Sequence, residues 1–311
     1  MTTLFYSHPD CRLHDMGEGH PECPQRLDAI SDHLLATGLD IMLQHEDAPL
    51  ATLEQLQRAH SAGYVLQLRD LLEQVRDGGE PRALDPDTVA APGTWQAALR
   101  AAGAAVAATD EVIAGRASNA FCAVRPPGHH ATRDETMGFC FFNNVAVAAR
   151  HALDVHGLQR VAIIDFDVHH GNGTEDIVAG DERILMCSFF QHPLYPHSGA
   201  VPKGTNMINV PVAPYTRGPE LRQTIEAMWW PRLDEFRPQM VFVSAGFDAH
   251  REDDLGQLGL VEADYEWITR RLVDVAARHA GGRLVSCLEG GYALSALARS
   301  VAAHLRVLAD A

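Results

Sequence analysis

The sequence has 311 residues, and its 25 basic and 41 acidic side chains give a formal net charge of −16. This acidic balance, without a basic stripe, argues against nucleic acids and anionic membranes as partners and weakly favours a cationic substrate. No signal-peptide pattern, no apolar run of membrane-spanning length and no C-x-x-C pair is present, so we expect a cytoplasmic protein.

The predicted elements alternate between helices and short apolar strands. Residues 1–24 are expected to be irregular, and no linker divides the chain, which predicts one domain over residues 1–311. Such alternation implies a mostly parallel sheet covered on both faces, with ligands bound beyond the carboxyl ends of its strands. Helices are predicted near 24–37, 52–58, 62–76, 95–113, 144–155, 217–235, 261–280 and 293–309, and strands near 121–124, 184–188, 207–210, 240–245 and 283–288, with a central strand from Val161.

The central strand leads into two acids and two imidazoles in the stretch from Val161 to Gly173. Because side chains alternate along an extended chain, we expect Asp165, Asp167 and His169 to project to one side. One acid or histidine after a strand is most often a helix cap or a turn residue. Two buried carboxylates without a cation would cost several kcal/mol, so this cluster favours a divalent ion such as Zn2+.

Chemically reactive side chains follow three other predicted strands. His129 and His130 follow one, Asp248 follows another, and Tyr292 follows a third. Asp248 is therefore the natural third metal ligand, which leaves a position open for water and a carbonyl. Any one of these residues, taken alone, is most often an ordinary core or surface residue. Beside a metal, the histidines are better interpreted as proton-transfer groups and the phenol as an oxyanion donor, which together suit amide hydrolysis.

The residues singled out above lie in four of five motifs, which are R-P-P-G-H-H at 125–130, G-F-C-F-F-N-N at 138–144, D-F-D-V-H-H-G-N-G-T at 165–174, S-A-G-F-D-A-H at 244–250 and L-E-G-G-Y at 288–292. Together the motifs resemble the zinc-dependent histone deacetylase family, in its bacterial, class II-like form. The resemblance covers nearly the whole chain and implies a single-domain α/β arginase/deacetylase fold on an eight-stranded parallel sheet. It also implies Zn2+ ligands at Asp167, His169 and Asp248, a base at His130, an electrostatic partner at His129 and an oxyanion donor at Tyr292.

The resemblance further implies a K+ site and a narrow substrate channel. The potassium ligands would be the Asp165 carboxylate, the Ser188 hydroxyl and the backbone carbonyls of Asp167, His169 and Phe189. Channel residues would be Gly138, Phe139, Tyr195 and Leu255, with Arg26 on the exit path of acetate and with Asp165 and Asn172 behind the catalytic histidines. Asn172 stands where class I members have an acid.

The resemblance leaves several functions open. The leading hypothesis is a deacylase that acts on acylated lysine, and its main rival is an acetylpolyamine amidohydrolase with the same catalytic residues. In polyamine-selective relatives a glutamate stands at the position of Leu255, although Glu252, Asp253 and Asp254 lie near enough in sequence to replace it. An inactive scaffold and an arginase-like dimanganese hydrolase are weaker alternatives. Bacterial relatives suggest a homo-oligomer, a dimer or tetramer, and Cys11 and Cys23 receive no role.

Overall fold

The computed structural model describes residues 2–310, and it confirms the α/β fold on an eight-stranded sheet. All neighbouring strands of this sheet pair in parallel, in the order β2-β1-β5-β10-β9-β6-β7-β8. A separate antiparallel ribbon is formed by β3 (Arg82–Ala83) and β4 (Val89–Ala90). The sheet strands are β1 (Thr3–Ser7), β2 (Leu43–Asp47), β5 (Asn119–Cys122), β6 (Val161–Asp165), β7 (Ile184–Gln191), β8 (Met207–Val212), β9 (Val241–Ala245) and β10 (Leu284–Leu288).

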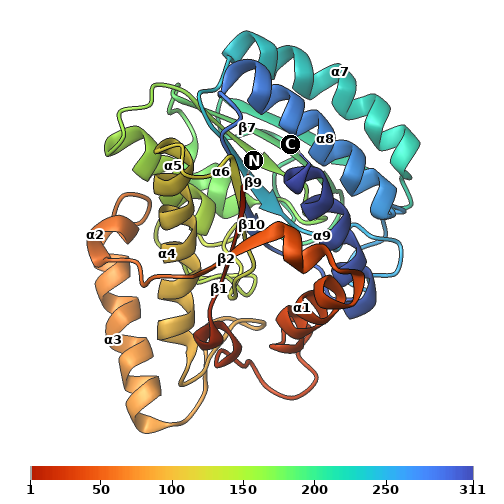
Figure 1. Cartoon of the computed structure of the whole chain (residues 1–311). Coiled ribbons are helices and arrows are strands. Elements are labelled where there is room, and N and C mark those ends of the chain that lie inside the picture. Colours follow the sequence, from red (N-terminus) through yellow and green to blue (C-terminus); the bar gives the residue numbers. More distant parts are fainter. Residues whose placement is uncertain (1, 311) are drawn as a thin grey trace.

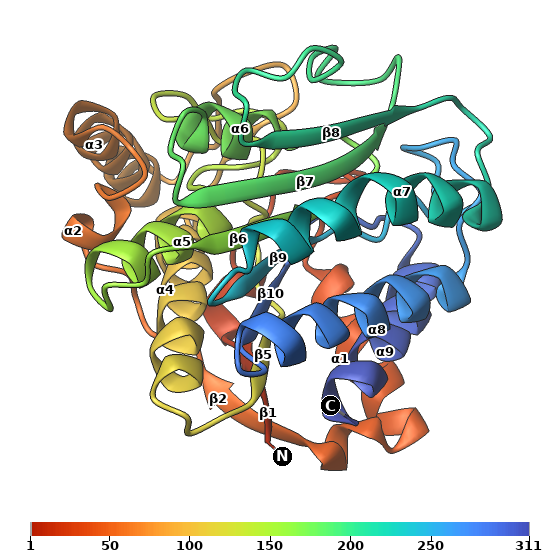
Figure 2. The same cartoon turned by 90° about the horizontal axis from the view of Figure 1, so that it is seen from above.

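Helices cover both faces of the sheet (Figures 1 and 2). One face carries α4 (Thr94–Ile113) and α5 (Asn144–Asp154), with α2 (Leu53–Leu56) and α3 (Ala62–Gly78) outside them. The other face carries α1 (Gln25–Thr37), α7 (Gly218–Phe236), α8 (Glu262–His279) and α9 (Leu294–Ala309). The short α6 (Asn172–Val178) follows the central strand. None of the helices within residues 2–310 is long and apolar enough to cross a bilayer.

The alanine-dense helix α4 packs closely because its buried side is made of small residues. Eight of its buried residues are alanine or glycine, and Gly103 faces the backbone of Pro49 and Ala51. A Cβ at Gly103 would come within 2.0 Å of the Pro49 carbonyl oxygen, so only glycine permits this approach. The strands contribute the other half of the core, since β5, β6, β9 and β10 are buried along their whole length. Cys122, Cys187 and Cys287 are buried on β5, β7 and β10 as free thiols.

The prediction that residues 1–24 are irregular is wrong, because β1 lies inside the sheet between β2 and β5. Its partner β2 was not predicted either. The sequence of β2, Leu-Gln-His-Glu-Asp, is mostly polar because the strand forms an edge of the sheet and exposes most of its side chains. Neither strand carries the long apolar run that revealed the central ones.

Two boundaries near the central strand also differ from the prediction. β5 covers Asn119–Cys122 and ends two residues before the expected Val124. β6 ends at Asp165, so Asp167 and His169 lie in the following loop and not on the strand, as their alternation had suggested. Asp165 is the last residue of the strand, whereas Asp167 and His169 lie in the loop, and Asp165 therefore contacts other groups than these two residues do. The loop then turns directly into α6, a helix that the sequence pattern had not revealed.

The four strands that precede the reactive residues are neighbours at the middle of the sheet. They are β5, β10, β9 and β6, in this order, although they are far apart in the sequence. Because all four run in parallel, their carboxyl ends lie on the same edge. The loops after them therefore bring the histidines, the acids and the phenol together.

Candidate active site

Asp167, His169 and Asp248 form a buried cluster with the donor atoms of a divalent-metal site. One ligand atom from each residue lies within 4.8 Å of the others. His169 Nδ1 lies 3.0 Å from Asp167 Oδ1 and 3.1 Å from Asp248 Oδ2. Both aspartates are fully buried, and burial together with the charge of Asp167 raises the pKa of Asp248 to about 7. A cation among the three ligands would neutralise this repulsion, so the donor set fits a Zn2+ ion.

Backbone amides fix the free carboxylate oxygens of the cluster. The Gly290 N–H donates to Asp167 Oδ2 at 2.8 Å, and the Val168 N–H donates to Asp248 Oδ1 at 2.8 Å. A Cβ at Gly290 would meet Asp248 Oδ2 at 2.1 Å, which explains why the loop after β10 needs glycine here. The remaining oxygens, Asp167 Oδ1 and Asp248 Oδ2, face His169. The site is therefore preorganised by groups from three different loops.

His129 and His130 lie beside the cluster, with their rings 4.0 Å apart. His129 Nδ1 lies 3.0 Å from Asp165 Oδ2, and His130 Nδ1 lies 2.7 Å from Asn172 Oδ1. Burial lowers the pKa of His130 well below its usual value, and the nearby His129 adds to this effect. Burial also opposes the charge of His129, but the carboxylates of Asp167 and Asp165 raise its pKa well above the usual range. The two adjacent imidazoles therefore differ strongly in their preferred protonation states.

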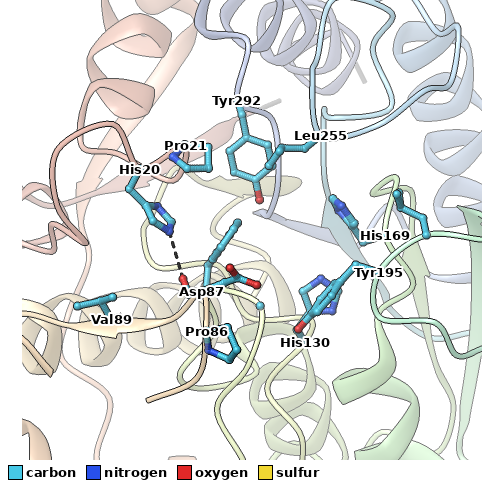
Figure 3. Close-up of a pocket in the computed structure, with 13 residues that line it drawn as sticks. His20, Pro21, Pro86, Asp87, Val89, His130, His169, Tyr195, Leu255 and Tyr292 are labelled. Carbon is cyan, nitrogen blue, oxygen red and sulfur yellow. Dashed lines mark hydrogen bonds between the residues drawn. The ribbon is translucent and has the colours of Figure 1, made fainter. Parts of the chain in front are cut away.

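Tyr292 faces the histidines across the pocket (Figure 3). Its hydroxyl points into the space bordered by His130, His169 and Tyr195. Burial, together with the charge of Asp248, raises the pKa of this phenol well above its usual value, so the hydroxyl keeps its proton. The Arg26 guanidinium lies over the Tyr292 ring, 5.1 Å from its centroid.

A pocket of about 420 Å³ leads from the surface to His130, His169 and Tyr292. The predicted channel residues Gly138, Phe139, Tyr195 and Leu255 all line it. Phe139 and Tyr292 meet edge to face, and Tyr195 meets His130 in the same manner. The structure adds a rim that the sequence had not revealed, formed by His20, Pro21, Pro86, Asp87, Val89 and Leu194.

One hydrogen-bond contact joins two segments of this rim. His20 Nε2 lies 3.1 Å from the carbonyl oxygen of Asp87, across 67 residues of sequence (Figure 3). The Asp87 side chain is exposed at the mouth. No motif or periodicity marks either segment as part of a site, and only their contact in the folded chain assigns them to it.

Glu289 is a buried carboxylate in the L-E-G-G-Y motif, and no role was predicted for it from the sequence. Its Oε2 accepts hydrogen bonds from the N–H groups of Gly128 and His129 at 2.6 and 3.1 Å, and its Oε1 accepts from the Ser244 hydroxyl at 3.1 Å. Burial raises its pKa to about 7. Glu289 thus connects the turn that carries the two histidines to the end of β9 and to the loop after β10.

Arg26 lies against the ring of Tyr292, and its role on an exit path for acetate stays a prediction. Its Nε–H donates to the Gly291 carbonyl at 2.7 Å, and an NH1 hydrogen donates to Glu22 Oε1 at 3.1 Å. Glu22 also pairs with Arg125, so two buried guanidinium groups share one buried carboxylate. Glu22 and Arg125 were not assigned to the site from the sequence. The two guanidinium groups together carry one more charge than the carboxylate that they share.

The residues predicted to bind potassium also lie together. Asp165 and Ser188 are directly paired on the adjacent strands β6 and β7, and both are fully buried. The Ser188 hydroxyl has no hydrogen-bond partner among the described residues, which is unusual for a buried polar group. Phe189 follows Ser188 on β7, and Asp167 follows Asp165 after β6. An ion beside Asp165 would supply the missing partner of the hydroxyl.

The three acids near Leu255 do not line the catalytic pocket, contrary to the possibility raised from the sequence. Asp253 Oδ1 accepts the Leu255 N–H at 3.0 Å, and its Oδ2 accepts the N–H groups of Tyr292 and Ala293. Glu252 pairs with Arg299. Asp254 is exposed and lines a different cavity.

A parallel sheet with acids, imidazoles and a phenol gathered at the carboxyl ends of its central strands defines a hydrolase of the arginase/deacetylase fold. A model of the histone deacetylase domain matches residues 20–308. The chain belongs to the histone deacetylase family and is a hydrolase that acts on amides.

Relatives and a solved structure agree with this assignment. The chain is 40% identical to a histone deacetylase-like amidohydrolase of Pseudomonas aeruginosa, over 88% of this chain and 73% of the relative. It is 36% identical to the polyamine deacetylase HDAC10 of Mus musculus, over 99% of this chain and 46% of the relative. The crystal structure of the HDA15 HD domain superimposes with a TM-score of 0.92 at 33% identity, and the match covers 99% of this chain and 88% of that one.

Proposed function

We propose that the protein is a Zn2+-dependent deacylase that removes acetyl or other acyl groups from the ε-amine of lysine side chains. The observation that carries this proposal is the pocket of about 420 Å³, which ends at His130, His169 and Tyr292 and has Phe139, Tyr195 and Leu255 in its lining. Such a lining accommodates the alkyl chain of an acylated lysine and leaves the amide at the polar end.

Asp167, His169 and Asp248 would hold the Zn2+ ion with two carboxylate oxygens and one imidazole nitrogen. The ion supplies Lewis-acid polarisation of the amide carbonyl. The three ligands come from two loops whose carboxylates are already held by backbone N–H groups. Little reorganisation of the chain is then needed when the metal binds.

His130 is the residue that we assign to proton transfer. It lies at the pocket end with its Nδ1 against the Asn172 side-chain oxygen, which leaves Nε2 free to receive a proton from the attacking water and to pass it to the leaving amine. His129, held by Asp165, would stabilise charge beside it. The Tyr292 hydroxyl would donate to the oxygen that becomes negative when the carbonyl is attacked.

A K+ ion is proposed as a structural cofactor next to Asp165. The supporting observations are the unpartnered hydroxyl of Ser188 and the paired position of these two residues on adjacent strands. A monovalent ion bound there would compensate a carboxylate that also orients His129. Potassium would thus stabilise the arrangement of the site without touching the substrate.

An acetylpolyamine is the second candidate substrate, and the similarity to a polyamine deacetylase is the observation that favours it. Against it stands Leu255, an apolar residue in the lining where polyamine-selective relatives have a glutamate. Asp87 is the acid at the mouth, but its side chain is exposed, and an ion pair at such a position contributes only about 0–1 kcal/mol. The lining therefore favours acyl-lysine.

A turnover panel tests the substrate assignment. The same enzyme preparation is assayed with acetyl-lysine peptides, with longer acyl-lysine peptides, and with acetylspermidine and acetylputrescine. We expect the highest kcat/KM with an acyl-lysine peptide. A higher value with an acetylpolyamine would assign the rival function, and no turnover of any amide by the Zn2+-loaded protein would support an inactive scaffold.

Assembly and location complete the proposal. We expect a cytoplasmic homo-oligomer, a dimer or a tetramer, from the behaviour of bacterial members of the family. Multi-angle light scattering of the purified protein at several concentrations measures its mass in solution. A mass of one 33.9 kDa chain at every concentration would contradict the expected oligomer.

A further inference from the structure

A second cluster of metal-ligand side chains lies outside the active site. It consists of Asp110 in the last turn of α4, His151 near the end of α5, and His156 just after α5. His151 Nε2 lies 2.7 Å from Asp110 Oδ1, and His156 Nε2 lies 2.6 Å from the same oxygen. Two imidazoles from one helix end thus converge on one carboxylate of the neighbouring helix.

This cluster lies on the edge of the sheet opposite to the active site. α4 and α5 each end shortly before a strand begins, β5 after α4 and β6 after α5. The cluster is therefore near the amino ends of strands whose carboxyl ends lead to His130 and Asp167. None of its three residues lines the catalytic pocket. Substitutions in this cluster therefore replace no catalytic residue and no residue of the pocket lining.

The donor set is the one that borderline divalent ions select. Two imidazole nitrogens and one carboxylate oxygen suit Zn2+, Ni2+, Cu2+ or Co2+, with water completing the coordination. The Asp110 carboxylate places the ring proton of His151 on Nε2, and its Nδ1 is buried with no hydrogen-bond partner among the described residues. An ion that binds Nε2 would shift this proton to Nδ1 and receive the lone pair of Nε2. Each ring meets the carboxylate through Nε2, the nitrogen farther from its own backbone.

The cluster has the freedom to open around an ion. Bonds of about 2.0–2.1 Å in a tetrahedral site separate ligand atoms by roughly 3.3 Å, so each nitrogen must move about 0.6–0.7 Å away from the carboxylate oxygen. The side chains of Asp110 and His156 are 42% and 26% exposed, and each can rotate toward solvent. The side chain of His151 is only 7% exposed, so it is the fixed ligand, and Asp110 and His156 adjust their positions to the ion.

We propose that Asp110, His151 and His156 bind a divalent first-row transition ion that clamps the end of α4 to the end of α5. The ion replaces two hydrogen bonds to one oxygen with three coordinate bonds. Binding needs both imidazoles neutral and the carboxylate ionised. An ion held only by the folded chain raises the free energy of unfolding by an amount that grows with the logarithm of the ion concentration above Kd.

Zinc titration of the Zn2+-loaded enzyme tests this proposal. Isothermal titration calorimetry and elemental analysis after equilibration with micromolar Zn2+ measure a second ion per chain. The variants are Asp110→Asn, which keeps a hydrogen-bond acceptor but removes the charge, and His156→Ala. His45→Ala is the matched control, because His45 Nε2 also contacts an aspartate, Asp40, at 2.9 Å but has no third ligand.

We expect the wild type and His45→Ala to bind a second Zn2+ with equal affinity. Asp110→Asn and His156→Ala should bind it at least about tenfold more weakly, since even residues that only orient a ligand cost 10- to 100-fold. The zinc-dependent rise of the unfolding temperature should be lost in the same two variants, while turnover at low free zinc stays unchanged. Absence of a second ion in the wild type, or its equal binding by Asp110→Asn, would overturn the proposal and leave a hydrogen-bonded cluster.

Discussion

Asp253 accepts the backbone N–H of Tyr292 through Oδ2 at 2.6 Å, and thereby connects the loop after β9 to the loop that carries the phenol. The same oxygen accepts the Ala293 N–H at 3.0 Å, and Oδ1 accepts the Leu255 N–H at 3.0 Å. Asp253 is buried and lines no part of the catalytic pocket. Its role is to position two residues that do line the pocket.

The first prediction is that Asp253→Asn lowers kcat about tenfold to hundredfold, because a small misplacement of a reacting group is costly. The side-chain amide of asparagine can place its own N–H donors against the backbone N–H groups of Tyr292 and Ala293, and two donors repel each other. A double-mutant cycle with Tyr292→Phe separates positioning from general damage. In the Tyr292→Phe background Asp253→Asn should change kcat little, and the exposed Asp254→Asn serves as control. Fully additive losses would show that Asp253 does not act through the phenol.

Tyr292→Phe should reduce kcat by about 10²–10³, the usual cost of one oxyanion donor. The ring is retained, so the contacts with Arg26 and Phe139 persist, and folding and metal content should be unchanged. Steady-state kinetics and circular dichroism measure both effects. Tyr195→Phe, which also removes a phenol oxygen from the pocket, should have a much smaller effect. If kcat of Tyr292→Phe equals that of the wild type, the oxyanion is stabilised by another group.

Metal removal should abolish turnover, and one equivalent of Zn2+ should restore it. Asp248→Asn should retain less zinc than the wild type after purification without added metal, because the substitution removes a charged ligand. Elemental analysis and activity are measured on the same samples. Asparagine has the same shape as aspartate and keeps an oxygen that can accept the Val168 N–H, so we expect the variant to fold. Full activity after exhaustive chelation would contradict a metal-dependent mechanism.

Leu255→Glu should shift the preference of the enzyme from acyl-lysine peptides toward acetylspermidine. The new carboxylate would lie in the pocket lining, where a desolvated contact with an ammonium is worth about 2–5 kcal/mol. The ratio of kcat/KM values should therefore change by at least about tenfold, which corresponds to about 1.4 kcal/mol. Leu255→Gln is the control, because glutamine has nearly the same shape as glutamate but carries no charge. An equal shift in both variants would trace the effect to polarity and not to charge.

The fifth prediction concerns stability at acidic pH. His304 is fully buried between Thr269 and Ser286, and burial lowers its pKa from 6.5 to about 3. Between these values only the unfolded chain binds the proton, so stability is complete above pH 6.5 and falls as the pH drops. One such group contributes a slope of about 1.4 kcal/mol per pH unit.

His304→Gln should remove this slope from the pH dependence of the free energy of unfolding, measured by denaturant titration between pH 4 and 7. The exposed His45→Gln should leave the slope unchanged. His14 and His60 are also buried with pKa values lowered to about 4, so the remaining curve should still fall toward acid. Identical slopes in His304→Gln and the wild type would show that His304 is already protonated in the folded chain.

The sequence by itself determined which chemistry the protein carries. Asp167, His169 and Asp248, the pair His129-His130 and Tyr292 each follow an apolar run, and an acid or imidazole directly after a buried strand is a local signal. The same runs predicted β6, β7, β9 and β10 within a few residues. The family motifs added the channel residues Phe139, Tyr195 and Leu255, which the folded chain places in one pocket.

Only the tertiary structure decided how these segments meet. The central order β5-β10-β9-β6 differs from the order along the chain, and it alone makes the four reactive strand ends neighbours. The structure also placed Glu289 behind the histidine turn, Asp253 behind Tyr292, and His20 against Asp87. These contacts join segments separated by dozens of residues. Periodicity and spacing report on neighbours along the chain, whereas a hydrogen bond between distant loops depends on how the whole sheet brings its strand ends together.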